Sequence, residues 1–212
     1  MYEYDIELSK WALLEVTGNV PSARQDHSAT LLGNNMIFIW GGRGDADYLN
    51  DGYLFDTTKR EWKVVQCKGP IPSPRSGFAT CLVGNKLFFL GGKVSGGTPG
   101  FSIIHILDVQ SFTFEMKKTW GQIPLPDKNF SAECINGDVI YKFGGEVGGN
   151  DLYALHTETL RWYFCNTGGR CPSYDETQDS LSFVPIKDKL VMFGTEENVY
   201  CLHLGLIPVD HP

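Results

Sequence analysis

The hydrophobic and polar positions of this chain form short runs typical of β-strands, and the set of runs repeats about every 50 residues. The segment from Arg24 to Trp62 holds one complete set: runs at 28–32, 36–40 and 52–56, and a last run that begins at Trp62. The run at 36–40 is apolar at every position, so it has no polar side for water and must lie between two neighbouring sheets. Repeated groups of four short strands predict the blades of a β-propeller.

Two independent markers give the same period. An aromatic residue follows a strand-end position in each unit, at Trp11, Trp62, Phe114 and Trp162. A glycine pair closes each apolar run, at Gly41-Gly42, Gly91-Gly92 and Gly144-Gly145, with a divergent copy at Gly194-Thr195. We therefore predict an all-β propeller of about four four-stranded blades, in one domain over residues 1–212, because stacked blades share a continuous core.

The blades are predicted at 24–66, 75–118, 128–166 and 177–203, after a tail of a blade in residues 1–16. The last blade is predicted to hold only three strands, at 180–184, 189–193 and 198–203. We expect the N-terminal strand to complete it, because this would remove both free edges. Two alternatives stay open: the chain is part of a larger propeller, or two chains each lend a first strand to the other's last blade.

The segment GPIPSPRSGFATCLVGNKLFFLGG at 69–92, with the later aspartate and aromatic residue, resembles Kelch repeats that carry Pro-x-x-Arg before the inner strand and a Trp after an Asp. The resemblance covers nearly the whole chain. It implies a propeller of the kind found in multi-partner scaffolds. Such motifs specify a fold strongly and a biochemical activity hardly at all.

Composition narrows the partners. The chain has 18 basic and 25 acidic residues, a net charge of −7, which gives no electrostatic reason to bind nucleic acid or an anionic membrane. No apolar run approaches the length of a membrane span, and the N-terminus has no signal pattern, so we expect a cytoplasmic or nuclear location. Zinc-knuckle, phosphate-loop and hydrolase motifs do not occur in the sequence, so we predict no metal, no cofactor and no catalytic activity.

Topology selects one surface for binding, which we call the loop face. The segments before the inner strands and the loops after the glycine pairs share one edge of the blades, and long loops on a rigid scaffold commonly carry function. The residues predicted to contact a partner there are Arg24, Arg43, Asp45, Tyr48, Arg75, Lys93, Phe101, Lys128 and Glu146. Mixed charge with a few aromatic side chains suits the recognition of a protein or peptide.

Arg24 and Arg75 have two interpretations. In Kelch proteins such arginines often line the partner site, which is what the resemblance implies for both. Alternatively, each arginine fixes its own loop by bonding carbonyl groups or a blade aspartate. His27 is predicted to be a packed core residue, because phenylalanine holds the equivalent places in later blades. Trp11, Trp62 and Trp162 are predicted to lie in the blade cores.

The leading hypothesis is a non-catalytic interaction module, an adaptor or scaffold whose partner is another protein or peptide. One alternative is a metal-dependent Kelch-like enzyme or specifier. Glu146, Asp151 and His156 approach the Glu-x-x-x-Asp-x-x-x-His pattern with which some Kelch-like proteins hold iron, but each gap is one residue too long. A further alternative is the targeting portion of a multidomain protein, such as a phosphatase regulator or a ubiquitin-ligase substrate receptor. Self-association that completes the last blade is also open.

Overall fold

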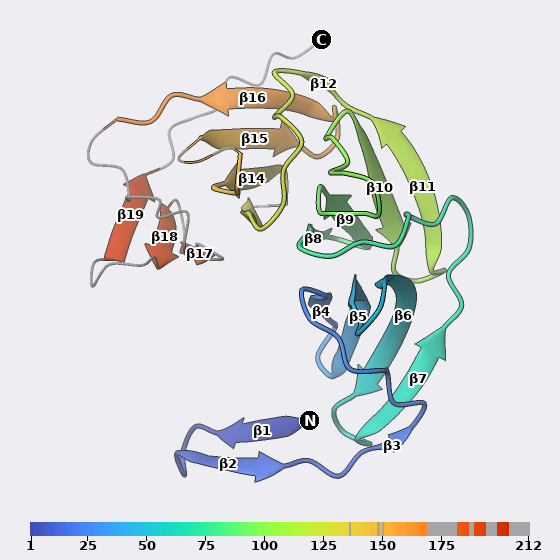
Figure 1. Ribbon diagram of the computed structural model, residues 1–212. Coiled ribbons are helices and arrows are strands. Elements are labelled where there is room, and N and C mark those ends of the chain that lie inside the picture. The colour runs from blue at the N-terminus through green and yellow to red at the C-terminus, as the bar shows by residue number, and fades with distance from the viewer. Residues whose placement is uncertain are drawn as a thin grey trace.

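Strands are the only regular elements in the part of the chain that the structure describes. The computed structural model describes residues 1–135, 137–147, 149, 151–168, 182–186, 189–193 and 199–203. Its sheets stand side by side in an arc around a common centre (Figure 1). In these ranges there is no helix with the length and apolar character needed to cross a membrane. The predicted all-β propeller with four blades is confirmed.

Each blade is an antiparallel sheet whose strands follow one another in sequence from the centre to the rim. Blade 1 contains β4 (Ser28–Leu32), β5 (Met36–Arg43), β6 (Tyr48–Asp56) and β7 (Glu61–Val65). Blade 2 contains β8 (Ala79–Val83), β9 (Lys86–Leu90), β10 (Ile103–Asp108) and β11 (Thr113–Lys118). Blade 3 contains β13 (Ser131–Ile135), β14 (Val139–Phe143), β15 (Leu152–His156) and β16 (Arg161–Cys165). The described strands of blade 4 are β17 (Ser182–Ile186), β18 (Lys189–Phe193) and β19 (Val199–His203).

The hydrophobic core lies between neighbouring blades. Trp40 of β5 is fully buried, and its ring meets those of Phe78 and Phe89 edge-on, with centroids 5.4 and 5.2 Å apart. Edge-to-face pairs of this kind contribute about 0.5–1.5 kcal/mol each beyond the burial of area. The second strands of blades 1 to 3 bury side chains on both of their sides, as their mainly apolar runs predict.

The connecting segments before blades 1 to 3 cover the rims of these blades, with a short strand at blades 1 and 3 and a single bridge, Lys68 to Thr113, at blade 2. β3 (Thr17–Gly18) pairs in parallel with β7, and β12 (Trp120–Gly121) pairs in parallel with β16. In the equivalent segment before blade 2, a Cβ on Gly69 would lie 2.3 Å from the carbonyl oxygen of Phe114. Glycine is therefore required for this close approach, and the outer edges of blades 1 to 3 are protected. These pairings could not be predicted from the sequence, because a two-residue strand leaves no hydrophobic period.

The N-terminal strand does not complete the last blade in the described structure, so that expectation is wrong. β1 (Tyr2–Asp5) and β2 (Lys10–Leu13) pair only with each other, while β17, β18 and β19 form a three-stranded sheet. The segment after β2 runs to the rim of blade 1, where Leu14 and Val16 pack against the blade core. This places the hairpin at the opposite end of the arc from blade 4 (Figure 1).

The hairpin has the side-chain pattern of the outer half of a blade without its burial. The rings of Trp11 and Tyr4 lie 4.9 Å apart, much as those of Trp62 and Phe55 lie 4.7 Å apart. Trp11 is nevertheless 70% exposed and Trp62 only 6%, because no described inner strand covers the hairpin. The prediction of a blade-core position is confirmed for Trp62 and Trp162 and wrong for Trp11.

Several strand boundaries differ from the prediction; β6, for example, begins at Tyr48 and not at residue 52. β5 continues through Gly41-Gly42, where we expected it to end, and its pairing with β6 shifts register between Trp40 and Gly42 before Arg43 faces Tyr48. The glycines, with φ of 63° and 95°, bend the strand as a β-bulge and re-aim the residues that follow. The predicted start of the inner strand of blade 4, at residues 180 and 181, lies outside the described residues, and the described part of β17 is Ser182–Ile186.

Candidate partner-binding face

A buried cation holds the loop face in blade 1. The guanidinium of Arg24 donates to the carbonyl oxygen of Gly41 at 3.1 Å and to the two carboxylate oxygens of Asp51 at 2.7 and 3.1 Å. The Arg24 side chain is 3% exposed. Burial acts to raise the pKa of Asp51, but the hydrogen bond and charge of Arg24 outweigh it, and the pKa falls below its ordinary value. Arg24 thus fixes the first glycine of the pair to the third strand, β6.

Blade 2 has the same cation without the carboxylate. Arg75 is 4% exposed and donates to the carbonyl oxygen of Gly91 at 3.0 Å. It meets no carboxylate among the described residues, because Ile103 stands where blade 1 has Asp51. Burial lowers the pKa of Arg75 to about 10, so the side chain still carries its charge near neutral pH.

Blade 3 obtains its cation from a different strand. Asp127 occupies the arginine position, and Lys142 of β14 donates to its Oδ2 atom at 2.7 Å and to the carbonyl oxygen of Gly144 at 2.6 Å. Both charged side chains are 1% exposed. Burial lowers the pKa of Lys142, and the hydrogen bond to Asp127 only partly offsets this. Asp127 also accepts from the backbone N–H of Val147, which ties the next loop to the same pair.

In all three blades a cation therefore reaches the carbonyl oxygen of the first glycine of the pair. For Arg24 and Arg75, these contacts agree with the interpretation that each arginine fixes its own loop. Their guanidinium groups have little surface left for a partner. A direct partner contact by either arginine stays a prediction.

Backbone hydrogen bonds join the segments that precede the inner strands. Asp26, Gly77 and Asn129 hold equivalent positions and share a left-handed backbone, with φ of 53°, 60° and 56°. The N–H of Gly77 donates to Asp26 at 3.0 Å, and that of Asn129 donates to Gly77 at 2.9 Å. Aspartate and asparagine tolerate this conformation better than other side chains. The three segments are thus positioned as one unit.

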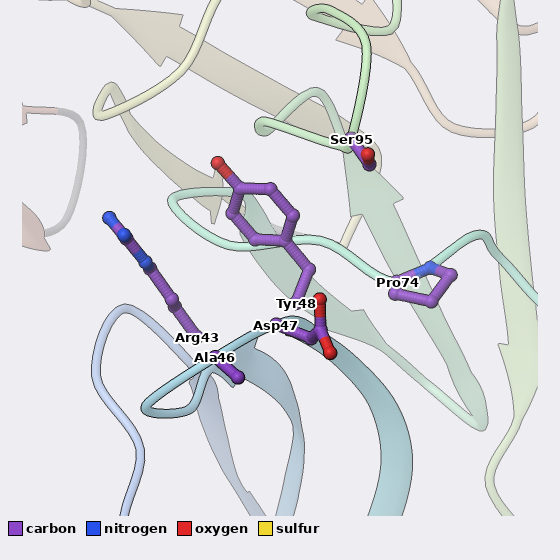
Figure 2. A pocket seen from close by; sticks show the side chains of 6 residues that line it. All are labelled: Arg43, Ala46, Asp47, Tyr48, Pro74 and Ser95. Atoms are coloured by element: carbon purple, nitrogen blue, oxygen red, sulfur yellow. The ribbon is translucent and has the colours of Figure 1, made fainter.

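A depression of about 460 Å³ lies between the loop after β5 and the adjoining segments of blade 2. It is lined by Arg43, Ala46, Asp47, Tyr48, Pro74 and Ser95. Figure 2 shows Arg43 and Tyr48 extending from the same loop, with Pro74 and Ser95 across from the tyrosine ring. The structure thus brings together two of the predicted residues, Arg43 and Tyr48. Arginine and tyrosine are enriched among the residues that dominate binding energy at protein interfaces.

Four more of the predicted residues reach the loop face. Asp45 and Lys93 are exposed, and Lys93 is bridged through its backbone to Ser76. Lys128 and Glu146 form an ion pair with each other, and the side-chain amide of Asn129 donates to the same carboxylate at 3.0 Å. The Lys128 and Glu146 charges therefore compensate each other.

Phe101 is not on the loop face, and its prediction as a surface contact is corrected. Its side chain is fully buried between blades 2 and 3. Its ring centroid lies 5.4 Å from that of Phe130 and 5.7 Å from that of Trp162. The chain after the Gly91-Gly92 loop turns inward at this position, so the phenylalanine fills the interface between the blades.

A second depression, of about 380 Å³, lies where the inner strands of blades 1 to 3 begin. It is lined by Gln25, Asp26, His27, Gly77, Phe78, Asn129 and Phe130. His27 is exposed, so its prediction as a core residue is wrong, although Phe78 and Phe130 are buried as expected. Each phenylalanine packs against the preceding blade, whereas only the hairpin precedes blade 1 in the described structure. Burial and the charge of Arg24 lower the pKa of His27, so its imidazole is mainly neutral at neutral pH.

Sequence reasoning missed the pair of Asp127 and Lys142. A signal was available, because Lys142 interrupts an apolar run at the position that Ile39 and Phe89 hold in the other blades. Pro74 and Ser95 were also missed as lining residues. These two carry no motif, and only the course of the loops brings them to the depression.

The residues of the iron-like pattern do not converge on one point. Glu146 bonds Lys128 and Asn129, while the Nδ1 atom of His156 accepts from the N–H of Thr159 at 3.3 Å. Within the described ranges, no three His, Cys, Asp or Glu side chains are grouped as metal ligands.

The repeated blades and their glycine pairs agree with a comparison against protein families. The family model described as the KLHDC2/KLHL20/DRC7 Kelch-repeats domain matches residues 1–195. The chain belongs to the Kelch-repeat family. The Kelch resemblance of the sequence is thereby confirmed, and Kelch propellers commonly act as protein-interaction modules.

Curated relatives share this region of the chain. Acyl-CoA-binding domain-containing protein 4 of Arabidopsis thaliana is 26% identical over 215 residues, covering 98% of this chain and 32% of the relative. Kelch domain-containing protein 3 of Rattus norvegicus is 28% identical over 188 residues, covering 82% of this chain and 48% of the relative. Kelch domain-containing protein 2 of Bos taurus is 25% identical over 222 residues, covering 92% and 54%. The chain thus spans between about a third and about half of the length of these relatives.

Proposed function

We propose that the chain is a non-catalytic interaction module that binds another protein or peptide through its loop face. The observation that carries this proposal is the depression lined by Arg43, Asp47 and Tyr48, which sits on segments fixed by buried cations. Arg43 forms no ion pair among the described residues, so its guanidinium is available to a partner. Asp45 and Lys93 add charge of both signs around the depression.

The rigidity of the support favours binding here. Two backbone hydrogen bonds tie the loop after β5 to Gln25. The N–H of Gln25 donates to the carbonyl oxygen of Arg43 at 2.9 Å, and the N–H of Arg43 donates to the carbonyl oxygen of Gln25 at 2.8 Å. The ring of Pro74 restricts the backbone of the facing segment, and Arg75 ties that segment to the carbonyl oxygen of Gly91. A preformed surface loses less conformational entropy when it binds, so more of the contact energy appears as affinity.

The test is a quantitative affinity capture from an extract of the source cells with the Arg43→Ala/Tyr48→Ala variant beside the wild type. A matched control is Lys59→Ala/Lys63→Ala, which changes exposed residues on the turn and outer strand of blade 1, away from the loop face. We expect the recovery of specific partners to fall about tenfold or more for the first variant, since two central contacts are removed. Equal recovery by both variants would place the partner site elsewhere.

The other interpretations stay predictions. The chain could act as the targeting portion of a multidomain protein through the same loop face, and the curated relatives are longer than the region they share with it. A metal-dependent activity would show as stoichiometric iron or copper in the purified protein. A cytoplasmic or nuclear location, and the expectation that neither nucleic acid nor membrane is bound, are tested by microscopy and by direct binding assays.

Self-association is a second candidate, favoured by the exposed hairpin. Trp11 is 70% exposed although its equivalents in blades 1 and 3 are buried. Tyr2 and Leu13, at 68% and 67%, are exposed beside it. Sedimentation velocity over a range of concentrations tests this: a dimer that disappears in Trp11→Ala would support it, and a monomer at every concentration would exclude it.

A further inference from the structure

The depression at the start of the inner strands has a lining rich in hydrogen-bond acceptors. It shares no lining residue with the depression between blades 1 and 2, to which the proposed function is assigned. The carboxylate of Asp26 is exposed at its wall. Asn129 donates through its Nδ2 atom to Glu146, which sets the orientation of the amide and turns its Oδ1 atom the other way. That oxygen lies 2.4 Å from the place a Cβ on Gly77 would take. Because residue 77 is glycine, the oxygen stays uncovered on this side.

The charged side chains next to the depression are paired with each other, and Asp26 is not part of these pairs. Arg24 is paired with Asp51, and Lys128 is paired with Glu146. Asp26 itself forms no ion pair among the described residues. An exposed carboxylate beside an amide oxygen attracts a group that has several N–H donors and a positive charge.

The rest of the wall suits the stem of a long side chain. Phe78 and Phe130 line the depression, and their largely buried rings give it an apolar part. The volume of about 380 Å³ is within the range of pockets that hold small ligands, and is ample for one long side chain. Arg43 lines the first depression, whereas no lysine or arginine among the described residues lines this one, so a cation on a partner meets no like charge in its wall.

We propose that this depression is a subsite for the guanidinium group of an arginine on the bound partner, held between the Asp26 carboxylate and the Asn129 amide oxygen. This inference rests on the proposed function, because it names one residue of the partner that the loop face would bind. It assigns the depression lined by Asp26 and Asn129 to a basic side chain. The depression lined by Arg43 and Tyr48 then contacts another part of the same partner.

The test uses N-acetyl-arginine amide as the probe, with N-acetyl-citrulline amide as its neutral isostere. Each is titrated into the isotopically labelled full chain, and the backbone amide resonances are followed by NMR. We expect arginine amide, with a dissociation constant on the order of millimolar, to shift Gly77, Asn129 and His27. Citrulline amide should bind about tenfold more weakly, since it lacks the charge.

Asp26→Asn and Asp45→Asn supply the matched pair of variants. Asparagine accepts the left-handed backbone at position 26, so this variant keeps its fold. Both variants lose one negative charge from the loop face, but only the first should weaken arginine binding about tenfold. Equal affinities for the two probes, or equal effects of the two variants, would overturn the subsite.

The outcome is separable from that of the proposed function. The probe needs no protein partner, so an absence of arginine binding leaves the capture result for Arg43→Ala/Tyr48→Ala unaffected. Conversely, arginine binding with unchanged capture by that variant would retain the subsite and overturn the role of the first depression.

Discussion

Blades 1 and 3 solve one structural problem with different residues. In blade 1, Arg24 comes from the segment before the inner strand and is neutralised by Asp51. In blade 3 that segment contributes the anion, Asp127, and Lys142 of the second strand contributes the cation. The carbonyl oxygen of the first glycine receives a cationic donor in both blades. The fold therefore requires a cation beside the carbonyl oxygen of the first glycine, and this cation can come from different sequence positions.

Blade 2 shows what happens when half of the arrangement is missing. Arg75 keeps the bond to Gly91 but has Ile103 in place of a carboxylate. A buried charge without a partner retains its desolvation penalty, which explains why burial lowers the pKa of Arg75. The three blades thus differ in whether the buried cation has a carboxylate partner, and substitutions can add or remove that partner.

The largest effect is expected in blade 3. Lys142→Met removes the cation that faces the buried carboxylate of Asp127, which should lower the free energy of unfolding by about 3–5 kcal/mol. The change is measured by urea denaturation followed by tryptophan fluorescence. The control, Asp127→Asn/Lys142→Met, removes both charges and should cost less than the single variant. A larger loss in the double variant would show that the pair is not coupled in this way.

A smaller loss is expected for Arg75→Ala. It removes a charged donor from Gly91 but leaves no carboxylate buried, so the cost should be about 1–3 kcal/mol. The same denaturation experiment compares it with Lys142→Met. If Arg75→Ala costs more than Lys142→Met, the missing carboxylate is not what separates the two blades.

Ile103→Asp should stabilise blade 2 by giving Arg75 the partner that Arg24 has. Ile103 is 49% exposed, so little apolar burial is lost, and we expect a gain of about 1 kcal/mol. Ile103→Asn is the uncharged control and should give no gain. A second readout is His105, whose pKa is lowered to about 4 by burial and by the charge of Arg75. Its pKa should rise in Ile103→Asp, as measured by NMR titration, and an unchanged value would show that no new pair forms.

The smallest effect is a dependence of blade 1 on pH. The folded pKa of Asp51 lies below its ordinary value of 3.8, so the stabilisation from its pair with Arg24 is present above that pH. It is lost as the pH falls through the lower pKa of the folded protein. The difference in unfolding free energy between wild type and Asp51→Asn should therefore shrink on acidification below 3.8. A difference that grows on acidification would contradict this sign.

The repeat and the strands could be predicted from the sequence, because they depend on local patterns. The apolar run at β5 and the aromatic residue of β7 are written in the chain with a fixed period. Burial of Phe101 and exposure of Trp11 could not be predicted in this way. Both depend on which residues of the neighbouring blade lie beside them, and the repeat spacing does not specify those contacts.

The candidate site was predictable only in part, for a similar reason. Arg43 and Tyr48 follow a glycine pair, so topology alone placed them on the loop face. The pairing of Lys142 with Asp127 joins two elements that each look ordinary alone. Whether a charged residue on such a face holds its loop or meets a partner is decided by contacts from the third strand and from the next blade. These contacts separate Arg24 from Arg43.

The most direct test places the residues that supply the cation in blade 1 at the equivalent positions of blade 3. The variant Asp127→Arg/Lys142→Ile gives blade 3 the arginine and the apolar strand residue that blade 1 has in Arg24 and Ile39. Its free energy of unfolding is compared with those of wild type and Lys142→Met. If the fold requires a cation at one place in space, the exchange should recover most of the stability that Lys142→Met loses. An exchange variant as unstable as Lys142→Met would contradict that claim.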